Sequence, residues 1–291
     1  MPSLLSLGWS WLRAPANELA FALRAAVRPS GRRLPLPHED KAHCFAHLSP
    51  AAAEAAAATA RALTERFALQ PLAAASTRAA FAGNLQHLAG LEALARGHAM
   101  PLGPDGVVRA TDAGCGDFHY ATALQRWLAW HETTAPRAVA LRGIELDGWV
   151  PHRDGSRRGG RARAHAALAM QGSTMATVAF QAADFTGVRL PPQDVVTMFF
   201  PFLTAGPCVR WGAPWSRLRP RRFVHRAVAS VRPGGWLVAV DQTDAEFARL
   251  QGLLAGQPVQ LLATQSWACD LVPWYPATAD QVGSLWLRLP D

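Results

Sequence analysis

A short glycine-punctuated turn at residues 112–116, Asp-Ala-Gly-Cys-Gly, separates an apolar run from a run with helical spacing. Glycines in such a turn let a backbone approach a nucleotide closely. The dinucleotide fingerprint also needs a small residue three positions after the second glycine, and that position holds His119. The turn therefore fits a nicotinamide or flavin cofactor poorly.

Acidic residues follow three successive apolar runs. Asp112 ends the first, Glu145 the second and Asp184 the third. A carboxylate at the first position can accept hydrogen bonds from an ammonium group, and the second can accept from both hydroxyls of a ribose. Asp184 can accept from the exocyclic amine of adenine while Phe185 packs on the ring. The three acids together predict a nucleoside cofactor with a cationic, amino-acid-like arm.

These segments resemble the motifs of the class I S-adenosylmethionine-dependent methyltransferases. Residues 112–116 match the first motif, 143–147 the second and 183–185 the third, and 230–237 resemble the late helix, Pro-Gly-Gly turn and fifth strand. The resemblance implies S-adenosyl-L-methionine as cofactor. The implied cofactor residues are Asp112, Ala113, Gly114, Cys115, Gly116, Glu145, Leu146, Asp147, Asp184 and Phe185.

One position departs from the family pattern. Phe118 stands where many members carry a third glycine, and we expect its side chain to tighten the pocket near the methionine arm. Methyl transfer is an in-line displacement that depends chiefly on alignment in a dry site. A hydroxyl or protonated amine acceptor also needs a base, for which the candidates near the turn are His119, Tyr120 and His152. An ordinary packed or surface role is the alternative for each.

The acceptor is less well defined than the cofactor. After the predicted fourth strand the chain reads MFFPFLT, so it lacks the Asn/Asp-Pro-Pro-aromatic motif typical of adenine or glutamine methylation. The basic segment 203–223 follows, and an anionic or aromatic small molecule is expected to meet Arg210, Trp211, Trp215 and Arg217 there. A basic surface loop with two packed tryptophans is the alternative. Cys208 is expected to be a buried structural cysteine.

Composition limits the partners. The chain has 29 Lys and Arg against 21 Asp and Glu, a net charge of +8, yet Lys41 is its only lysine. This arginine skew indicates compositional bias more than a phosphate-binding surface, so nucleic acid is an unlikely partner. A second arginine group is expected to form a solvated helix face: Arg153, Arg157, Arg158, Arg161 and Arg163.

Cysteine and histidine spacing predicts no metal. Four cysteines without CxxC spacing fit a reducing compartment, and we expect a cytoplasmic protein. No standard zinc pattern is formed by His38, His43, Cys44 and His47. The apolar start of the chain is interrupted by Arg13, Glu18 and Arg24, which argues against a signal peptide or a spanning helix. A helix docked on the protein or on a membrane surface remains open.

Two regions of different character make up the chain. Residues 1–105 predict a helical segment that caps the cofactor cleft, with a linker at 28–40 and helices beginning at Ser49 and near Ser76. In residues 106–291, apolar runs alternate with amphipathic runs, which predicts an α/β Rossmann-like fold with helices on both faces. The resemblance implies a seven-stranded sheet, mostly parallel, whose last strand is antiparallel.

The sequence thus predicts an S-adenosylmethionine-dependent methyltransferase acting on an O, N or C nucleophile of a small molecule. Two alternatives stay open. One is an enzyme that transfers another part of the cofactor, such as its aminocarboxypropyl arm. The other is a binding or scaffold protein that retains the fold.

Overall fold

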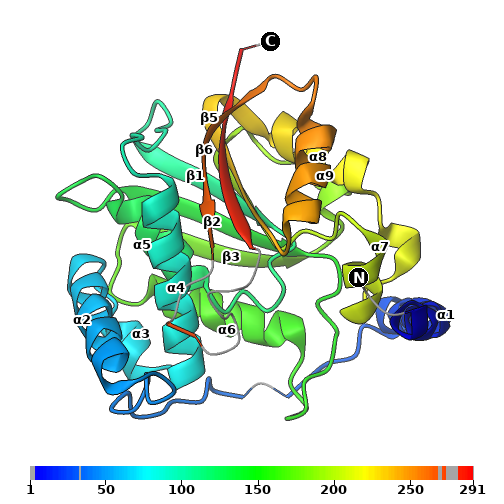
Figure 1. Cartoon of the computed structure of the whole chain (residues 1–291), viewed down its shortest axis with the longest axis horizontal. Helices are drawn as coiled ribbons and strands as arrows, with labels where there is room; N and C mark the ends of the chain where they lie inside the picture. The colour runs from blue at the N-terminus through cyan, green and yellow to red at the C-terminus, as the bar shows by residue number, and fades with distance from the viewer. Residues whose placement is uncertain (1–3, 33, 268–270, 273–280, 291) are drawn as a thin grey trace.

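The structure, a computed structural model, describes residues 4–32, 34–267, 271–272 and 281–290, with side chains from residue 13 onward. The chain folds around a single seven-stranded sheet (Figure 1). Its strands are β1 (Val107–Ala113), β2 (Ala138–Glu145), β3 (Ala176–Ala182), β4 (Gln193–Phe199), β5 (Val231–Asp241), β6 (Val259–Ser266) and β7 (Val282–Arg288).

Strand order confirms the predicted architecture. The order is β3-β2-β1-β4-β5-β7-β6. The first five strands pair in parallel, whereas β7 is antiparallel to both β5 and β6. The Pro-Gly-Gly sequence lies inside β5 as a register shift against β4, with Gly234 at φ +77°, rather than before the strand. The order reverses direction between β1 and β4, and ligands of open α/β sheets bind at such a point.

Helices cover both faces of the sheet (Figure 1). One face carries α2 (Pro50–Arg66), α3 (Gln70–Ala74), α4 (Arg78–Leu94), α5 (Ala121–Trp130) and α6 (Arg158–Met170). The other carries α8 (Pro220–Ser230) and α9 (Asp244–Leu254), and between β4 and α8 lie α7 (Ala205–Arg210) and the short 3-10 turn η2 (Trp215–Arg217). A further 3-10 turn, η1 (Phe185–Gly187), follows β3.

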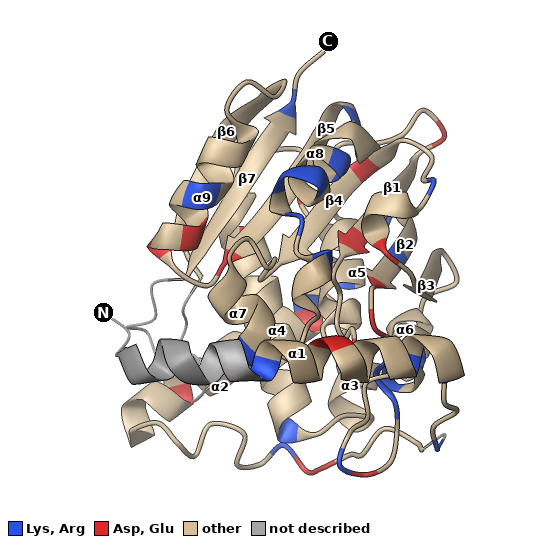
Figure 2. Ribbon diagram, turned by 90° about the vertical axis from the view of Figure 1, so that its right-hand side faces the viewer, with Lys and Arg blue, Asp and Glu red and all other residues tan. Residues whose placement is uncertain are grey.

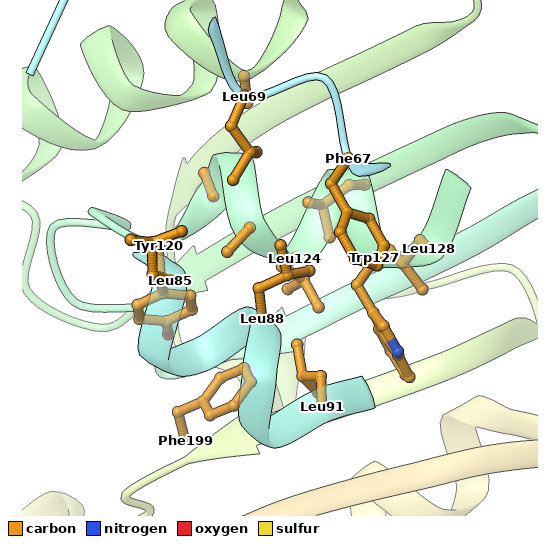
Figure 3. Packing of buried hydrophobic residues seen from close by; sticks show 14 of the residues in the cluster. Phe67, Leu69, Leu85, Leu88, Leu91, Tyr120, Leu124, Trp127, Leu128 and Phe199 are labelled. Carbon is orange, nitrogen blue, oxygen red and sulfur yellow. The ribbon is translucent and has the colours of Figure 1, made fainter. Parts of the chain in front are cut away.

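Helices α2, α3 and α4 contribute to the main core. Ser49 and Thr77 cap α2 and α4 by accepting hydrogen bonds from Ala52 N and Ala80 N. The apolar spacing of α4 places Leu85 and Leu88 in one buried cluster with α5 (Figure 3). This cluster also reaches strand residues on the same face of the sheet. Helix α4 therefore packs against the back of the glycine turn.

Helix α1 (Leu4–Val27) lies apart from these layers, at the edge where the parallel strands end (Figure 2). Its contacts fix this position: Arg24 reaches Asp147, just after β2, and Asn17 reaches Val209 in α7. The described residues of the predicted linker at 28–40 have no regular secondary structure, and this segment leads from α1 toward α2. No described helix is long and apolar enough to cross a membrane.

Candidate cofactor site

The glycine turn follows β1 at the carboxyl edge of the sheet. Gly114 and Gly116 have φ values of +81° and +58°, which side chains with a Cβ rarely adopt. Amides of Gly114 and Cys115 both donate to Ile144 O, at 2.8 and 3.1 Å, which ties the turn to the end of β2. A Cβ built on either glycine would meet no atom within 4 Å beyond its immediate neighbours. The turn therefore presents an open backbone surface.

Phe118 packs away from this surface. It has φ +57°, so it adopts the backbone conformation for which glycine is favoured. Its ring is fully buried, and a Cβ on Gly143 of β2 would lie 2.9 Å from that ring. The expectation that Phe118 tightens the methionine pocket is wrong. The missing Cβ at Gly143 leaves room for the ring beneath the turn.

Asp112 also lies beneath the turn. It is fully buried, and its two oxygens accept hydrogen bonds from Tyr120 Oη at 2.7 Å and Thr197 Oγ1 at 2.6 Å. Burial raises the pKa of Asp112 to about 7, against the opposing effect of these two hydrogen bonds. Direct capture of an ammonium group, the role expected from sequence, is not available to a carboxylate in this position. Strand alternation turns the side chain onto the face covered by α4 and α5.

Tyr120 belongs to the same buried group. Its ring stacks on that of His87, with the ring centroids 4.6 Å apart. It also meets the ring of Phe199 edge-on, with the centroids 4.8 Å apart; Tyr120 and Phe199 are both labelled in Figure 3. Burial, with the adjacent charge of Asp112, raises the pKa of Tyr120 well above its usual value. These contacts argue against Tyr120 as a proton acceptor, because its hydroxyl is committed to Asp112.

Helix α4 holds the turn from behind, a role that sequence analysis missed. Asn84 donates to His119 O at 2.8 Å and accepts from Ala123 N at 3.0 Å, so it bridges the turn and the start of α5. Burial lowers the pKa of His87 to about 3, which keeps this stacked imidazole neutral. The sequence signal was a group of polar residues inside an apolar helix: Asn84, Gln86 and His87.

Glu145 occupies the end of β2, as predicted, and faces the turn. One oxygen accepts from Gly116 N at 3.0 Å, and the other accepts from Asp147 N and from Arg158 at 3.1 Å each. Arg158 at the start of α6 therefore forms an ion pair at the site instead of a solvated face, contrary to expectation. The pair keeps the carboxylate oriented across the turn from the glycines.

Asp147 is buried and bound to α1. Its oxygen Oδ2 lies 2.6 Å from Arg24 Nη2, and its Oδ1 accepts from Trp149 N at 3.2 Å. The neighbouring Leu146 is half-buried. Asp147 therefore joins the end of β2 to α1, through an arginine 123 positions away in the sequence.

The third predicted pair is placed differently. Asp184 is exposed, and its Oδ1 accepts from Thr186 N and Oγ1 at 2.9 and 2.7 Å, which caps η1. Phe185 is buried, with its ring 5.3 Å from that of Phe223 in the core on the α8 face. The role of this pair in binding adenine stays a prediction.

A carboxylate and three histidines border the turn on its other side. Asp117 Oδ1 lies 3.0 Å from His119 Nδ1, and the His119 side chain is 44% exposed. Although burial opposes it, the hydrogen bond from His119 and the nearby His165 and His152 hold the pKa of Asp117 well below its usual range. Burial lowers the pKa of His165 to about 4. His152 Nε2 is buried without a hydrogen-bond partner among the described residues, and burial lowers the pKa of this side chain.

The arrangement of strands and turn identifies the architecture. The sheet is seven-stranded and mostly parallel with an antiparallel last strand, as the family resemblance implied. The glycine turn after β1 faces Glu145 at the end of β2. The chain therefore has a Rossmann-like α/β architecture.

Several solved structures are similar to parts of this chain at low identity. A putative class I S-adenosylmethionine-dependent methyltransferase from Listeria monocytogenes has a TM-score of 0.47 at 15% identity, over 72% of this chain and 60% of that one. Magnesium protoporphyrin IX methyltransferase from Synechocystis, with bound S-adenosylmethionine, has a TM-score of 0.45 at 13% identity, over 72% and 81%. The [4+2]-cyclase SpnF has a TM-score of 0.44 at 15% identity, over 71% and 82%.

These likenesses concern the fold alone. This chain spans 60% of the length of the Listeria protein and 46% of that of TrmN from Thermus thermophilus. No protein-family model matches the sequence, and no curated protein matches it.

The predicted acceptor residues lie in segments that contact α1. Trp211 and Trp215 are 65% and 39% exposed, Arg210 is exposed, and Arg217 lies 5.8 Å above the Phe21 ring of α1. Cys208 is buried, and burial raises its pKa to about 11, which suits a structural cysteine. The basic segment 203–223 thus contacts α1, and its role in binding an acceptor stays a prediction.

A second acidic pair lies at the end of β5, and sequence analysis did not single it out. Asp241 is fully buried, and neither of its oxygens has a hydrogen-bond donor among the described residues. Burial, reinforced by the charge of Glu246, raises the pKa of Asp241 to about 8. Glu246 Oε1 accepts from Thr204 at 3.1 Å, and burial raises its pKa as well. Both side chains favour the protonated form more than ordinary carboxyls do.

The histidines and cysteine near residue 40 do not converge. Within the described ranges, no group of three or more His, Cys, Asp or Glu side chains is arranged to hold a metal. Cys44 donates to Arg78 O at 3.6 Å, and burial raises its pKa. Of the four cysteines, Cys269 lies outside the described residues, and Cys44, Cys115 and Cys208 are free thiols.

Proposed function

We propose that this protein is an S-adenosylmethionine-dependent methyltransferase acting on a small molecule. The observation that carries the proposal is the open backbone of Gly114 and Gly116 facing Glu145. An open glycine surface suits a nucleoside cofactor, and a carboxylate at the end of β2 suits its ribose. When bound, S-adenosylmethionine supplies an electrophilic methyl group on a sulfonium.

The chain's own residues divide the binding roles. Gly114 and Gly116 provide the surface, Glu145 accepts from ribose hydroxyls, and Asp184 accepts from the base. Asp112 supports the turn from below through Tyr120 and Thr197 instead of meeting the ligand. Of the predicted 1–105 cap, α1 is the part we assign to covering this edge, because its contacts span the segments after β2 and β4.

His119 is the proposed base where the acceptor needs one. Its Nδ1 lies 3.0 Å from Asp117, which leaves Nε2 to receive a proton. Substitution of His119 by Ala should lower the rate for an acceptor that must lose a proton, and Asp117→Asn should shift the pH dependence of that rate. His152 is the alternative, because its Nε2 lacks a partner among the described residues.

Calorimetric titration tests the cofactor. We expect S-adenosylmethionine and its demethylated product to bind the wild type, and Glu145→Gln to weaken binding at least about tenfold through loss of charge-assisted hydrogen bonds. Glu54→Gln on the exposed side of α2 is the matched control and should bind as the wild type does. Absence of binding to the folded wild type, or equal binding by both variants, would remove the cofactor assignment.

Product mass separates the enzymatic alternatives. Incubation with candidate anionic or aromatic acceptors should yield a product heavier by one methyl group. A gain the size of an aminocarboxypropyl group would instead identify that transferase, and tight binding without any product would favour the scaffold alternative. Cytoplasmic localisation remains a prediction, consistent with the free thiols of the described cysteines.

A further inference from the structure

Helix α1 turns its polar side chains toward the protein. Asn17 Nδ2 donates to Val209 O at 3.0 Å, and Glu18 accepts from Ser216 N and Oγ at 2.6 and 2.8 Å. Arg24 pairs with Asp147 at 2.6 Å. Phe21, on the same side, is the buried apolar residue of this part of the helix. A surface helix of a soluble domain normally does the reverse and buries its apolar side.

The outer side of α1 is uniformly apolar. Apart from Arg13, the exposed positions among residues 13–27 are apolar, and at 100° per residue they fall within one stripe. Leu19, Leu23 and Val27 are 63%, 57% and 71% exposed. The whole stripe consists of Pro15, Ala16, Leu19, Ala22, Leu23, Ala26 and Val27. Figure 2 shows α1 lying across the front of the molecule.

The flanks of this stripe are basic and aromatic. Exposed Trp211 lies in the segment that contacts α1. Arg28 and Arg217 lie over the rings of Trp149 and Phe21, at 5.7 and 5.8 Å. Neither arginine forms an ion pair with a described acid, nor does exposed Arg13. Glu18 in α1 already accepts a hydrogen bond from Ser216, and Asp147 already forms an ion pair with Arg24.

This combination selects one occupant. An apolar stripe with aromatic and arginine neighbours matches an interfacial helix, whose apolar side enters the boundary of headgroups and acyl chains. Unpaired guanidinium groups attract anionic headgroups. A second copy of this chain would bring the same arginines toward each other, without neighbouring acids to compensate them. The preceding residues of the α1 sequence, 4–12 (LLSLGWSWL), contain no charged residue either.

We propose that the outer side of α1 docks on the surface of an anionic lipid bilayer. The helix lies in the plane of the interface and is held to the protein by its polar side. Leu19, Leu23 and Val27 enter the lipid, while Arg13, Arg28 and Arg217 contact phosphates. The inference is independent of the proposed transferase activity.

Co-sedimentation of the full chain with lipid vesicles tests the proposal. We expect binding to vesicles of phosphatidylcholine with about one third phosphatidylglycerol, and weaker binding to phosphatidylcholine alone. High salt should reduce the difference, because it screens the arginines. The triple variant Leu19→Gln, Leu23→Gln, Val27→Gln should bind anionic vesicles at least about tenfold more weakly. Its fold should persist, since the three side chains are exposed.

A matched control uses exposed apolar residues at the opposite edge of the sheet. Leu102 and Met175, before β1 and β3, are 44% and 50% exposed, and their conversion to Gln should leave vesicle binding unchanged. Absence of wild-type binding to anionic vesicles at low salt would overturn the proposal. So would equal binding by the triple variant, or a dimer in solution that this variant alone abolishes, which would make a second copy the occupant.

Discussion

Tyr120 donates a hydrogen bond of 2.7 Å to Asp112 directly beneath the open glycine turn. The two residues are eight positions apart, and both are buried. The bond explains why a carboxylate at the end of β1 is retained in an apolar layer. It makes Asp112 a support for the turn.

Tyr120→Phe should destabilise the fold in a pH-dependent way. We expect the free energy of unfolding to fall by about 1–3 kcal/mol above pH 7, where the ionised carboxylate of Asp112 depends on its hydrogen-bond donors. The loss should be smaller near pH 5, where Asp112 is protonated because its folded pKa is about 7. Urea unfolding at the two pH values measures the effect, and Thr197→Val is the companion variant for the other oxygen. An equal loss at both pH values would contradict this account.

Asp241→Asn should make the protein more stable at alkaline pH. In the folded protein the pKa of Asp241 is about 8, raised from 3.8. The contribution of its protonated form to wild-type stability is therefore fully present below pH 4 and is lost as the pH rises toward 8. In that window the free energy of unfolding of the wild type falls by up to about 1.4 kcal/mol per pH unit. The variant keeps a neutral side chain of the same shape and should lack this component.

Thermal unfolding between pH 5 and 8 tests this prediction. The difference between variant and wild type should grow with pH. Asp184→Asn is the control, because Asp184 is an exposed carboxylate that follows a different strand, β3. An Asp241→Asn protein less stable than the wild type at pH 8 would show that ionised Asp241 has a stabilising partner.

Gly143→Ala should destabilise the fold through its contact with Phe118. The added Cβ would lie 2.9 Å from the Phe118 ring and 2.9 Å from Cys115 Sγ. Overpacking of this kind costs about 1–3 kcal/mol. In a Phe118→Ala background the cost should shrink, because the ring is gone. A double-mutant cycle by chemical unfolding gives the coupling, and additive effects would contradict it.

Gly83→Ala is the matched control for this substitution. A Cβ at Gly83 would meet nothing within 4 Å, and the residue lies inside α4. Alanine has the higher helix propensity, so stability should rise by about 0.5–1 kcal/mol. The two Gly→Ala changes should therefore have opposite signs.

Arg24→Gln should loosen α1. Breaking the ion pair leaves the 6%-exposed carboxylate of Asp147 without its cation. We expect protease cleavage within residues 28–40 to accelerate about fivefold, as local opening becomes easier. Arg61→Gln on the exposed side of α2 is the control and should leave the cleavage rate unchanged. Equal rates for all three proteins would show that α1 is held by its other contacts.

Much of the site could be predicted because its signals are local. Glycines with positive φ, an acid at a strand end and alternating apolar runs are readable over a few residues. This is why the sequence places Gly114, Gly116 and Glu145 at the edge of the sheet. The family resemblance adds a mostly parallel sheet of seven strands with an antiparallel last strand, whereas the order of the strands comes from the structure.

Tertiary structure decided which way the side chains face and which residues form ion pairs. Whether Asp112 faces a ligand or the core depends on which helices cover each side of β1, and that is set by α4 and α5. Arg24 and Arg158 become ion-pair partners of acids after β2 only when distant elements meet. The inverted amphipathicity of α1 has the same origin: sequence periodicity shows that a helix has two sides, and only packing determines which one faces solvent.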